Sequence, residues 1–329
     1  MVDSSGVSIQ SARIRMDNTD VISADMIKAE ANDLGFSACG MAKAGPVSTD
    51  HADFFRKWLL KGCQADMAYM ECHTDKRLDP TLLMERATTV VSVALNYFPS
   101  RQIPSSGLQL SWYVYGKDYH DVMKEKLYQL LNRIQCRAGF SVNGRAFCDT
   151  APVLEKYWAC QCGIGWIGKH TQLIVPHAGS TFFLGELLLD CVADHYDKPI
   201  QRDCGTCRRC VEACPVGALI PTEGLDARRC LSYLTIENRG DIPVDAASKM
   251  YPYFYGCDRC LKACPHLAFS EPSQEDAFCL KPELMEMTEE KWMNLSVDDY
   301  RRLFKGSAVK RAKYEGLKRN LEAMMRNKK

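Results

Sequence analysis

Apolar residues recur at helical spacing in four segments of the first half of the chain. Positions 25–34 form one such pattern, which ends at Gly35, and positions 50–61 form a second. A longer helix is predicted over 122–138 and a shorter one over 153–162. Each pattern leaves one polar face, so these helices are expected to pack on a layer beneath them.

Strand patterns separate these helices. Residues 88–98 are β-branched and continuously apolar, which is typical of a strand buried on both faces. Shorter strands are predicted over 36–42, 172–176 and 182–189, and another ends at Cys148. Mixed helices and strands predict an α+β or α/β layer domain for residues 21–195.

A different pattern begins at Cys204, where cysteines replace apolar periodicity. Cys204, Cys207, Cys210 and Cys214 precede Pro215 with the spacing C-x2-C-x2-C-x3-C-P. Bacterial ferredoxins use this run to bind cubane iron–sulfur clusters, and its fourth cysteine ligates a second cluster. The run predicts a ferredoxin-like domain over residues 196–275.

A second run, Cys257, Cys260 and Cys264 before Pro265, lacks its first cysteine because Phe254 stands there. Two cubanes need eight thiolates, and Cys230 between the runs supplies the eighth. We assign one [4Fe-4S] cluster to Cys204, Cys207, Cys210 and Cys264. We assign the other to Cys214, Cys230, Cys257 and Cys260. A structural zinc site, or one cubane with spare cysteines, is the alternative.

Composition changes this picture little. The 329 residues are 46% hydrophobic and 25% charged with a net charge of +1, as in ordinary globular proteins. The 17 cysteines and the clusters indicate a reducing, cytoplasmic location with free thiols. Residues 1–20 are polar and aperiodic, so a disordered tail without an export signal is expected. No apolar run approaches the ~18 residues of a membrane span.

Positive charge is concentrated at the C-terminal end. From Arg301 to Lys329 there are eleven Lys or Arg and two Glu. The segment 276–329 is predicted to be helical and basic. It is either a solvated helix face or a surface that contacts nucleic-acid phosphates.

A glycine-rich loop, Gly163–Gly168, matches two nucleotide-binding patterns. The dinucleotide pattern requires a strand before the loop and a helix after it, whereas the reverse is predicted here. The P-loop pattern fails because His170 replaces the magnesium-binding hydroxyl. Neither nucleotide site is predicted.

Nearly the whole chain, from about residue 20 to 325, resembles the epoxyqueuosine reductase family. The resemblance includes both cysteine runs and a series of short motifs in the family's order. These motifs are Lys76–Pro80, Ala94–Pro99, Tyr115–His120, Asp149–Glu155, Gly163–Lys169, Phe183–Glu186, Arg228–Ser232 and Gly306–Arg311.

The resemblance implies a cobalamin-binding domain of the reductive-dehalogenase and nitroreductase-like type, over residues 21–195. It also implies that two [4Fe-4S] clusters pass electrons from an external one-electron donor to cobalamin. The expected reaction reduces epoxyqueuosine to queuosine at the wobble position of tRNA anticodons, the last step of queuosine biosynthesis. We expect a cytoplasmic monomer that binds the anticodon stem-loop.

Site residues follow from the family's motifs. Asp149 is the expected proton donor, and an apolar surrounding is expected to raise its pKa; capping the next helix is its alternative role. Tyr119 and His120 are expected to position substrate or relay protons. The expected cobalamin contacts are Arg77, Asp149, Lys169, Leu173, Leu184, Ser232 and Asp258. The expected tRNA contacts are Arg301, Arg302, Lys305, Lys310, Arg311 and Lys313.

Two residues depart from the family pattern: His170 stands where asparagine is expected, and Thr181 where many members carry tryptophan. Both are expected near the cobalamin. Two other functions are alternatives. A corrinoid reductive dehalogenase would carry a twin-arginine export signal and lack the basic tail. A simple electron carrier would need no domain before the clusters.

Overall fold

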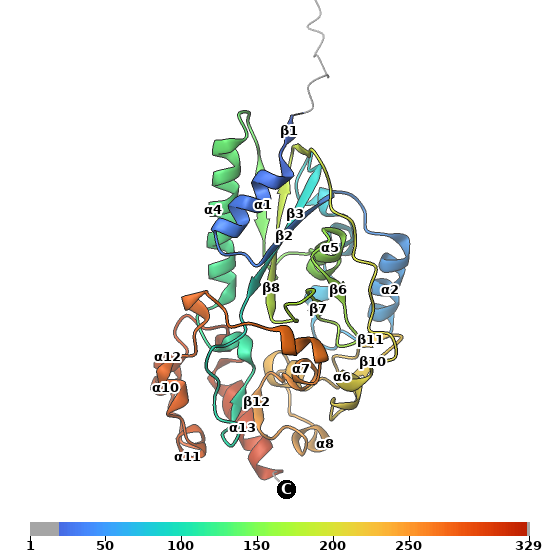
Figure 1. Cartoon of the computed structure of the whole chain (residues 1–329). Coiled ribbons are helices and arrows are strands. Elements are labelled where there is room, and N and C mark those ends of the chain that lie inside the picture. The colour runs from blue at the N-terminus through green and yellow to red at the C-terminus, as the bar shows by residue number, and fades with distance from the viewer. Residues whose placement is uncertain (1–19, 328–329) are drawn as a thin grey trace, which may run out of the picture.

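A four-stranded antiparallel sheet forms the centre of the upper part of the molecule in Figure 1. Its strands lie in the order β2 (Ala38–Lys43), β3 (Thr89–Asn96), β8 (Phe182–Leu189) and β5 (Gly144–Phe147). The computed structural model describes residues 20–327. Strand β3 is buried along its length except at Asn96, as its continuous apolar pattern predicts.

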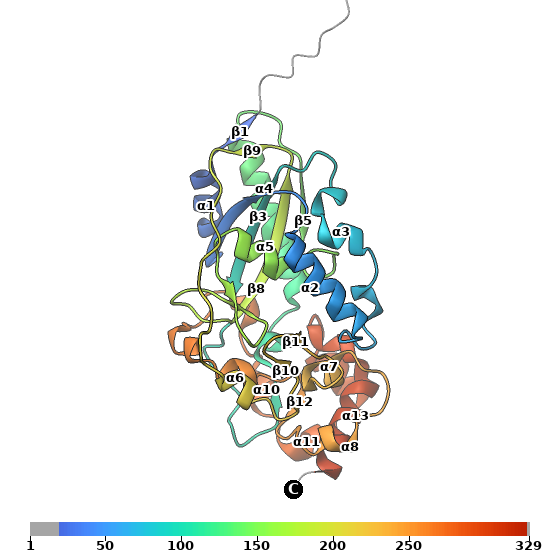
Figure 2. The same ribbon diagram turned by 90° about the vertical axis from the view of Figure 1, so that its right-hand side faces the viewer.

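Helices cover both faces of this sheet (Figures 1 and 2). On one face, α1 (Ala24–Asp33) and α4 (Tyr119–Arg137) pack on alternate strand residues such as Val91 and Leu187. On the other, α2 (Thr49–Leu60) and α5 (Glu155–Gln161) pack on the intervening residues. The alternation follows from the two-residue period of a strand.

Helix α4 begins at Tyr119, three residues before the predicted start at Val122. The reason is a capping interaction, in which the Asp118 carboxylate accepts the His120 N–H at 3.1 Å. The cap places Tyr119 and His120 in the first turn of the helix, at the lower edge of the sheet.

The glycine-rich loop joins α5 to the hairpin of β6 (Trp166–Ile167) and β7 (Leu173–Ile174). A helix therefore precedes the loop and strands follow it. This order is the reverse of the one that both nucleotide-binding patterns require, as the sequence predicts. A Cβ on Gly165 would lie 2.2 Å from the Ile174 carbonyl oxygen, so close strand approach requires glycine there.

A separate core holds the cysteine runs and the C-terminal helices together. Helices α6 (Arg209–Glu212) and α9 (Arg259–Lys262) each carry one cysteine of a run. Strand β12 (Tyr253–Tyr255) pairs in parallel with β4 (Gln109–Leu110) from the first half of the chain. Phe254, which replaces the missing cysteine, is buried in this core, and its ring centroid lies 4.7 Å from that of Trp292.

Among residues 20–327, no helix is long and apolar enough to cross a membrane. The expected tail, residues 1–20, lies outside the described residues except for Asp20. The other elements are β1 (Val21–Ile22), α3 (Thr74–Leu78), β9 (Val192–Ala193), β10 (Leu219–Ile220), β11 (Gly224–Leu225), α7 (Leu231–Ile236), α8 (Val244–Ala247), α10 (Pro282–Met285), α11 (Glu289–Met293), α12 (Val297–Leu303) and α13 (Lys313–Arg326).

Candidate active site and cysteine cavities

Four cysteines from both runs line one cavity of about 100 Å³. They are Cys204, Cys207, Cys210 and Cys264, the set predicted to share a cluster. His170 and His266 line the same cavity. The backbone N–H of Lys169 donates to the Cys204 sulfur at 3.4 Å, so the end of the glycine loop lies against this group.

The other four cysteines, Cys214, Cys230, Cys257 and Cys260, are partly buried and form a second group. Burial, followed by the proximity of Cys257, Cys230 and Cys214, raises the pKa of Cys260 far above its ordinary value. The backbone N–H of Ala218 donates to the Cys214 sulfur at 3.2 Å. Arg259 donates to the Cys257 sulfur at 3.5 Å. Donors of this kind stabilise thiolates bound to iron–sulfur clusters.

A single zinc ion is the alternative occupant of the cysteine groups. Within residues 20–327, no three or more His, Cys, Asp or Glu side chains are placed to hold a single metal ion. Zinc–sulfur bonds of about 2.3 Å would draw four sulfurs tightly together. The first group instead surrounds a cavity, which suits a cluster of several metal atoms.

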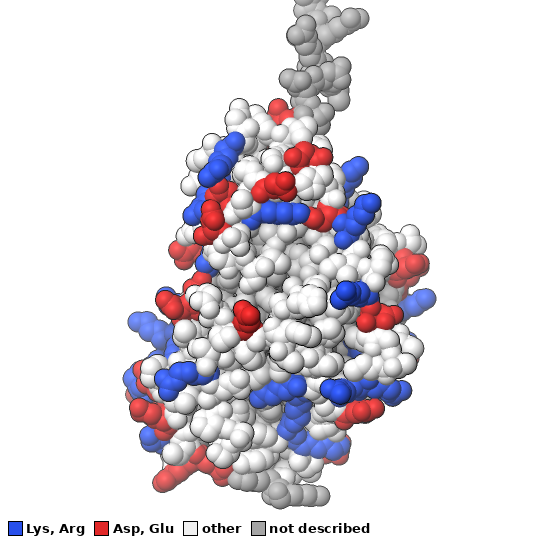
Figure 3. Space-filling model, viewed as in Figure 1, with Lys and Arg blue, Asp and Glu red and all other residues white. Residues whose placement is uncertain are grey.

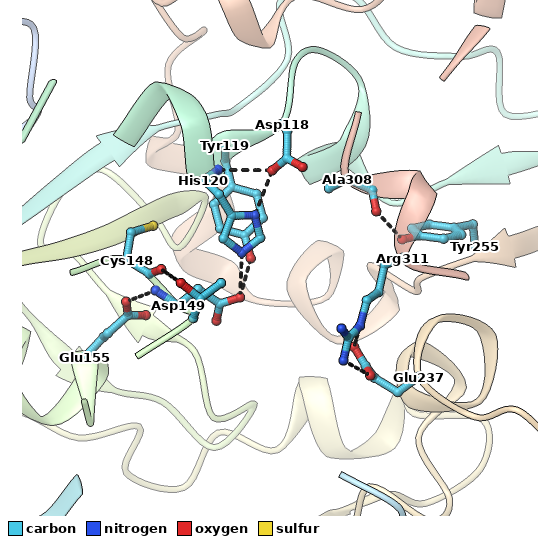
Figure 4. Close-up of polar contacts among 11 residues, drawn as sticks. Asp118, Tyr119, His120, Cys148, Asp149, Glu155, Glu237, Tyr255, Ala308 and Arg311 are labelled. Carbon is cyan, nitrogen blue, oxygen red and sulfur yellow. Dashed lines mark hydrogen bonds and ion pairs between the residues drawn. The ribbon is translucent and has the colours of Figure 1, made fainter. Parts of the chain in front are cut away.

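A second polar site lies at the end of β5, where Asp149 has a positive φ of 53°. Its carboxylate accepts the Tyr119 hydroxyl at 2.6 Å and faces His120 Nε2 at 3.1 Å (Figure 4). The other ring nitrogen of His120 lies 2.7 Å from the Asp118 carboxylate. Tyr119 is stacked between His120 and Phe183, with centroids 4.0 and 4.3 Å away. We name Tyr119, His120 and Asp149 the acid cluster.

The acid cluster changes where protons reside. Partial desolvation of the Asp149 carboxylate favours a raised pKa, but hydrogen bonds from His120 and Tyr119 outweigh it and hold that pKa below its ordinary value. The expectation of a raised pKa was therefore wrong for this arrangement. Burial opposes protonation of His120, yet hydrogen bonds to Asp118 and Asp149 raise its pKa to about 9. At neutral pH the carboxylate is ionised and the imidazole holds the proton.

Two carboxyl groups with raised pKa values lie behind this site, and sequence reasoning gave neither a role. Glu155 accepts the backbone N–H of Asp149, and burial followed by the charge of Asp149 raises its pKa to about 8. Glu186 is fully buried on β8, where it accepts the Ser92 hydroxyl at 3.2 Å, and burial raises its pKa well above normal. The only sequence signal was their place in the Asp149–Glu155 and Phe183–Glu186 motifs.

The predicted cobalamin contacts lie on several elements. Arg77 is buried at the end of α3, where it donates to the Tyr69 carbonyl at 3.0 Å. Its Nε has no hydrogen-bond partner among the described residues. The ammonium group of Lys169 donates to the Cys207 carbonyl at 3.0 Å. The Asp258 carboxylate accepts a hydrogen bond from the backbone N–H of Trp112 at 2.8 Å. Leu173 and Leu184 are buried in the core, on β7 and β8, and Ser232 is half-buried on α7.

The predicted tRNA contacts are exposed, but three of the six are already paired. Arg311 forms a two-pronged ion pair with Glu237 at 2.7 and 2.8 Å. Figure 4 shows this pair on the opposite side of the view from the acid cluster. Arg301 and Arg302 pair within their own helix, with Asp298 and Asp299 respectively. In the part of the chain that the structure describes, Lys305, Lys310 and Lys313 form no ion pair.

Comparison with known proteins shows the family to which the chain belongs. The family model "Epoxyqueuosine reductase QueG, DUF1730" matches residues 77–150, and a "4Fe-4S double cluster binding domain" matches residues 203–267. An epoxyqueuosine reductase of Cellulophaga algicola is 44% identical over 93% of this chain and 99% of its own length. The chain belongs to the epoxyqueuosine reductase family.

Other epoxyqueuosine reductases agree with this membership. The Xanthomonas campestris protein is 36% identical over 95% of this chain and 88% of its own length. The structure from Streptococcus thermophilus superposes with a TM-score of 0.81, at 26% identity over 92% of this chain and 80% of that one. A family structure with an epoxyqueuosine-modified tRNA-Tyr stem loop gives a TM-score of 0.82, at 25% identity and the same coverage. The predicted α+β fold, the oxidoreductase class and the double-cluster domain are thus confirmed.

Proposed function

We propose that this chain reduces epoxyqueuosine to queuosine at the wobble position of tRNA, the last step of queuosine biosynthesis. The observation that carries the proposal is the acid cluster at the end of β5, in a family member that also gathers eight cysteines in two groups. The reaction breaks both carbon–oxygen bonds of the epoxide. Two electrons and two protons are consumed, an alkene remains and the oxygen leaves as water.

Asp149 is the member of the acid cluster that substrate can reach, because its side chain is 56% exposed whereas that of His120 is 24% exposed. As negative charge develops on the epoxide oxygen, Asp149 delivers a proton that His120 supplies to it. Tyr119 holds the carboxylate in place through its 2.6 Å hydrogen bond. A positioned acid of this kind accelerates proton transfer by roughly 10²–10⁴-fold.

Each group of four cysteines is proposed to hold one [4Fe-4S] cluster, in the sets given above. One observation shows that the protein fits cobalamin. Among the described residues, the buried Nε of Arg77 has no hydrogen-bond partner, and this guanidinium lies close to Asp149 and Glu155. Arg77, Lys169, Leu173, Leu184, Ser232 and Asp258 are the residues proposed to hold it. When bound, cobalamin would supply a strongly reducing cobalt centre for the two-electron reduction, and the clusters would be the source of its electrons.

The basic segment Arg301–Lys313 is proposed to contact the phosphates of the anticodon stem-loop. Lys305, Lys310 and Lys313 suit this role because their charges are exposed and free of ion pairs within the described residues. Sequence-specific RNA recognition commonly uses bases splayed out of a loop, and the wobble base would reach Asp149 in that way. We also propose that the protein is a monomer and works in the cytoplasm. Its domain boundaries are proposed at about residues 195 and 275.

An external one-electron donor is also part of the proposal. Figure 3 shows Lys and Arg side chains in a band across the lower half of the molecule, over the part that carries the cysteine runs. A negatively charged electron-transfer protein is the kind of donor that such a band attracts.

The test uses anaerobically reconstituted protein, a strong reductant and tRNA that carries epoxyqueuosine. Digestion of the tRNA and mass spectrometry are expected to detect queuosine only when both cobalamin and the clusters are present. Survival of the epoxide with both clusters reduced would contradict the proposal. A halogenated aromatic substrate would then be assayed, because a corrinoid reductive dehalogenase is the alternative.

A further inference from the structure

His170 follows the glycine-rich loop and is only 2% exposed. Its Nδ1 accepts the backbone N–H of Gln172 at 3.1 Å. A Cβ on Gly168 would lie 3.0 Å from the imidazole ring, so the absence of a side chain there lets the ring pack closely. The ring is therefore held in one orientation by its backbone partner and by the loop.

The same contacts determine which ring nitrogen carries hydrogen. Nδ1 accepts the hydrogen bond from the Gln172 backbone, so it carries no hydrogen and the ring is neutral. A neutral ring that accepts a hydrogen bond at Nδ1 carries its hydrogen on Nε2. That Nε2 is buried and has no hydrogen-bond partner within the described residues.

An unpaired buried donor is costly, so its surroundings indicate what it binds. His170 lines the cavity formed by Cys204, Cys207, Cys210 and Cys264. His266 lines it too, and its buried Nδ1 likewise has no hydrogen-bond partner in the described part of the chain. The His266 ring packs edge-on against Trp166, with centroids 5.2 Å apart. Sulfur atoms of a cluster in this cavity are the acceptors that such donors lack.

We propose that His170 donates its Nε2–H to a sulfur of the cluster held by Cys204, Cys207, Cys210 and Cys264, and thereby raises that cluster's reduction potential. The inference rests on the cysteine assignment proposed above. Reduction adds one electron to the cluster, and a hydrogen bond stabilises the added negative charge. The other cysteine group receives its donors from Arg259 and Ala218 instead, so His170 acts on one cluster alone.

The first test is a redox titration of the reconstituted protein followed by electron paramagnetic resonance. In His170→Leu, one of the two reduction waves is expected to move to more negative potential while the other stays in place. His170→Asn keeps an amide donor and is expected to shift less. His51→Leu is the matched control, because His51 lies on α2 against Tyr157 and does not line the cavity.

Two outcomes of this titration would overturn the proposal. One is a His170→Leu protein with two full clusters and both waves unchanged. The other is a shift seen only when cobalamin is bound, which would mean that His170 faces the cobalamin. Iron and sulfide analysis separates these outcomes from failure of the proposed function, which would appear as missing clusters or as the absence of queuosine.

A second measurement needs no variant to fold. Wild-type protein labelled with ¹⁵N-histidine is reduced, and pulsed electron paramagnetic resonance is recorded in H₂O and in D₂O. Coupling of the cluster to a histidine nitrogen, together with an exchangeable proton, is expected. If neither coupling is present in reduced wild-type protein, the hydrogen bond does not exist and the proposal fails.

Discussion

The acid cluster and the basic segment Arg301–Lys313 differ in how their charges are used. In the acid cluster, Tyr119 and His120 converge on the one Asp149 carboxylate within 3.1 Å. In the basic segment, the charges are spread over the surface, and its three arginines are neutralised by neighbouring carboxylates. A concentrated site suits bond breaking and a dispersed one suits binding, so changes in the first should alter kcat and changes in the second KM.

The largest effect is expected from Asp149→Asn. The amide cannot pass a proton to the epoxide oxygen, so kcat should fall by roughly 10²–10⁴-fold with little change in KM. Single-turnover formation of queuosine measures the chemical step. Asp299→Asn, which removes an exposed carboxylate on α12, is the control and should retain full kcat. If Asp149→Asn and Asp299→Asn have equal kcat values, Asp149 is not the proton donor.

The pH dependence of kcat provides the next test. Hydrogen bonds to Asp118 and Asp149 raise the pKa of His120 to about 9, above its free value, so the proton is present at neutral pH and is lost as pH rises through about 9. The rate should therefore be constant near neutrality and fall above about pH 9. His120→Gln should be slower and should lack this fall. An unchanged profile in His120→Gln would assign the fall to another group.

Much of the fold on which these sites stand could be predicted from local pattern. Strand β3, helix α1 and helix α2 follow apolar periodicities that end at clear stop signals, and the structure has them within one or two residues. The cysteine spacing likewise predicted which thiols lie together, because a short run with fixed intervals wraps only one way. Which cluster each thiol ligates stays a prediction.

What escaped prediction depends on partners distant in sequence. The pairing of β4 with β12 joins residues about 145 positions apart. The lowered pKa of Asp149 depends on His120 and Tyr119, which come from another element. The ion pair between Arg311 and Glu237 likewise depends on how two separate segments pack. Spacing along the chain contains no information on such contacts. Capping by Asp118 is different, because an aspartate directly before a helix is a local signal of its start.

A smaller effect is expected on the binding side from Lys310→Ala combined with Arg311→Ala. Removing the free Lys310 charge, and exposing the Glu237 carboxylate that Arg311 neutralises, should weaken tRNA binding by roughly tenfold at moderate salt and flatten the dependence of log Kd on log salt. Filter binding over a range of salt concentrations measures both quantities. The rate at saturating tRNA should stay near wild type. Unchanged affinity at every salt concentration would exclude this segment as the tRNA surface.

The smallest effect on tRNA binding is expected for Arg301 and Arg302. It also tests most directly whether paired charges in the basic segment contribute to binding. Each is exposed and pairs with an aspartate one turn earlier, so their net contribution to the surface potential is small. Replacing both with alanine should weaken tRNA binding less than the change at positions 310 and 311. Converting Asp298 and Asp299 to asparagine should have the opposite sign and strengthen binding, since it frees both guanidinium groups for phosphate. If the asparagine variant binds tRNA no more tightly at low salt, helix α12 lies outside the tRNA footprint, and the binding surface narrows to the unpaired lysines.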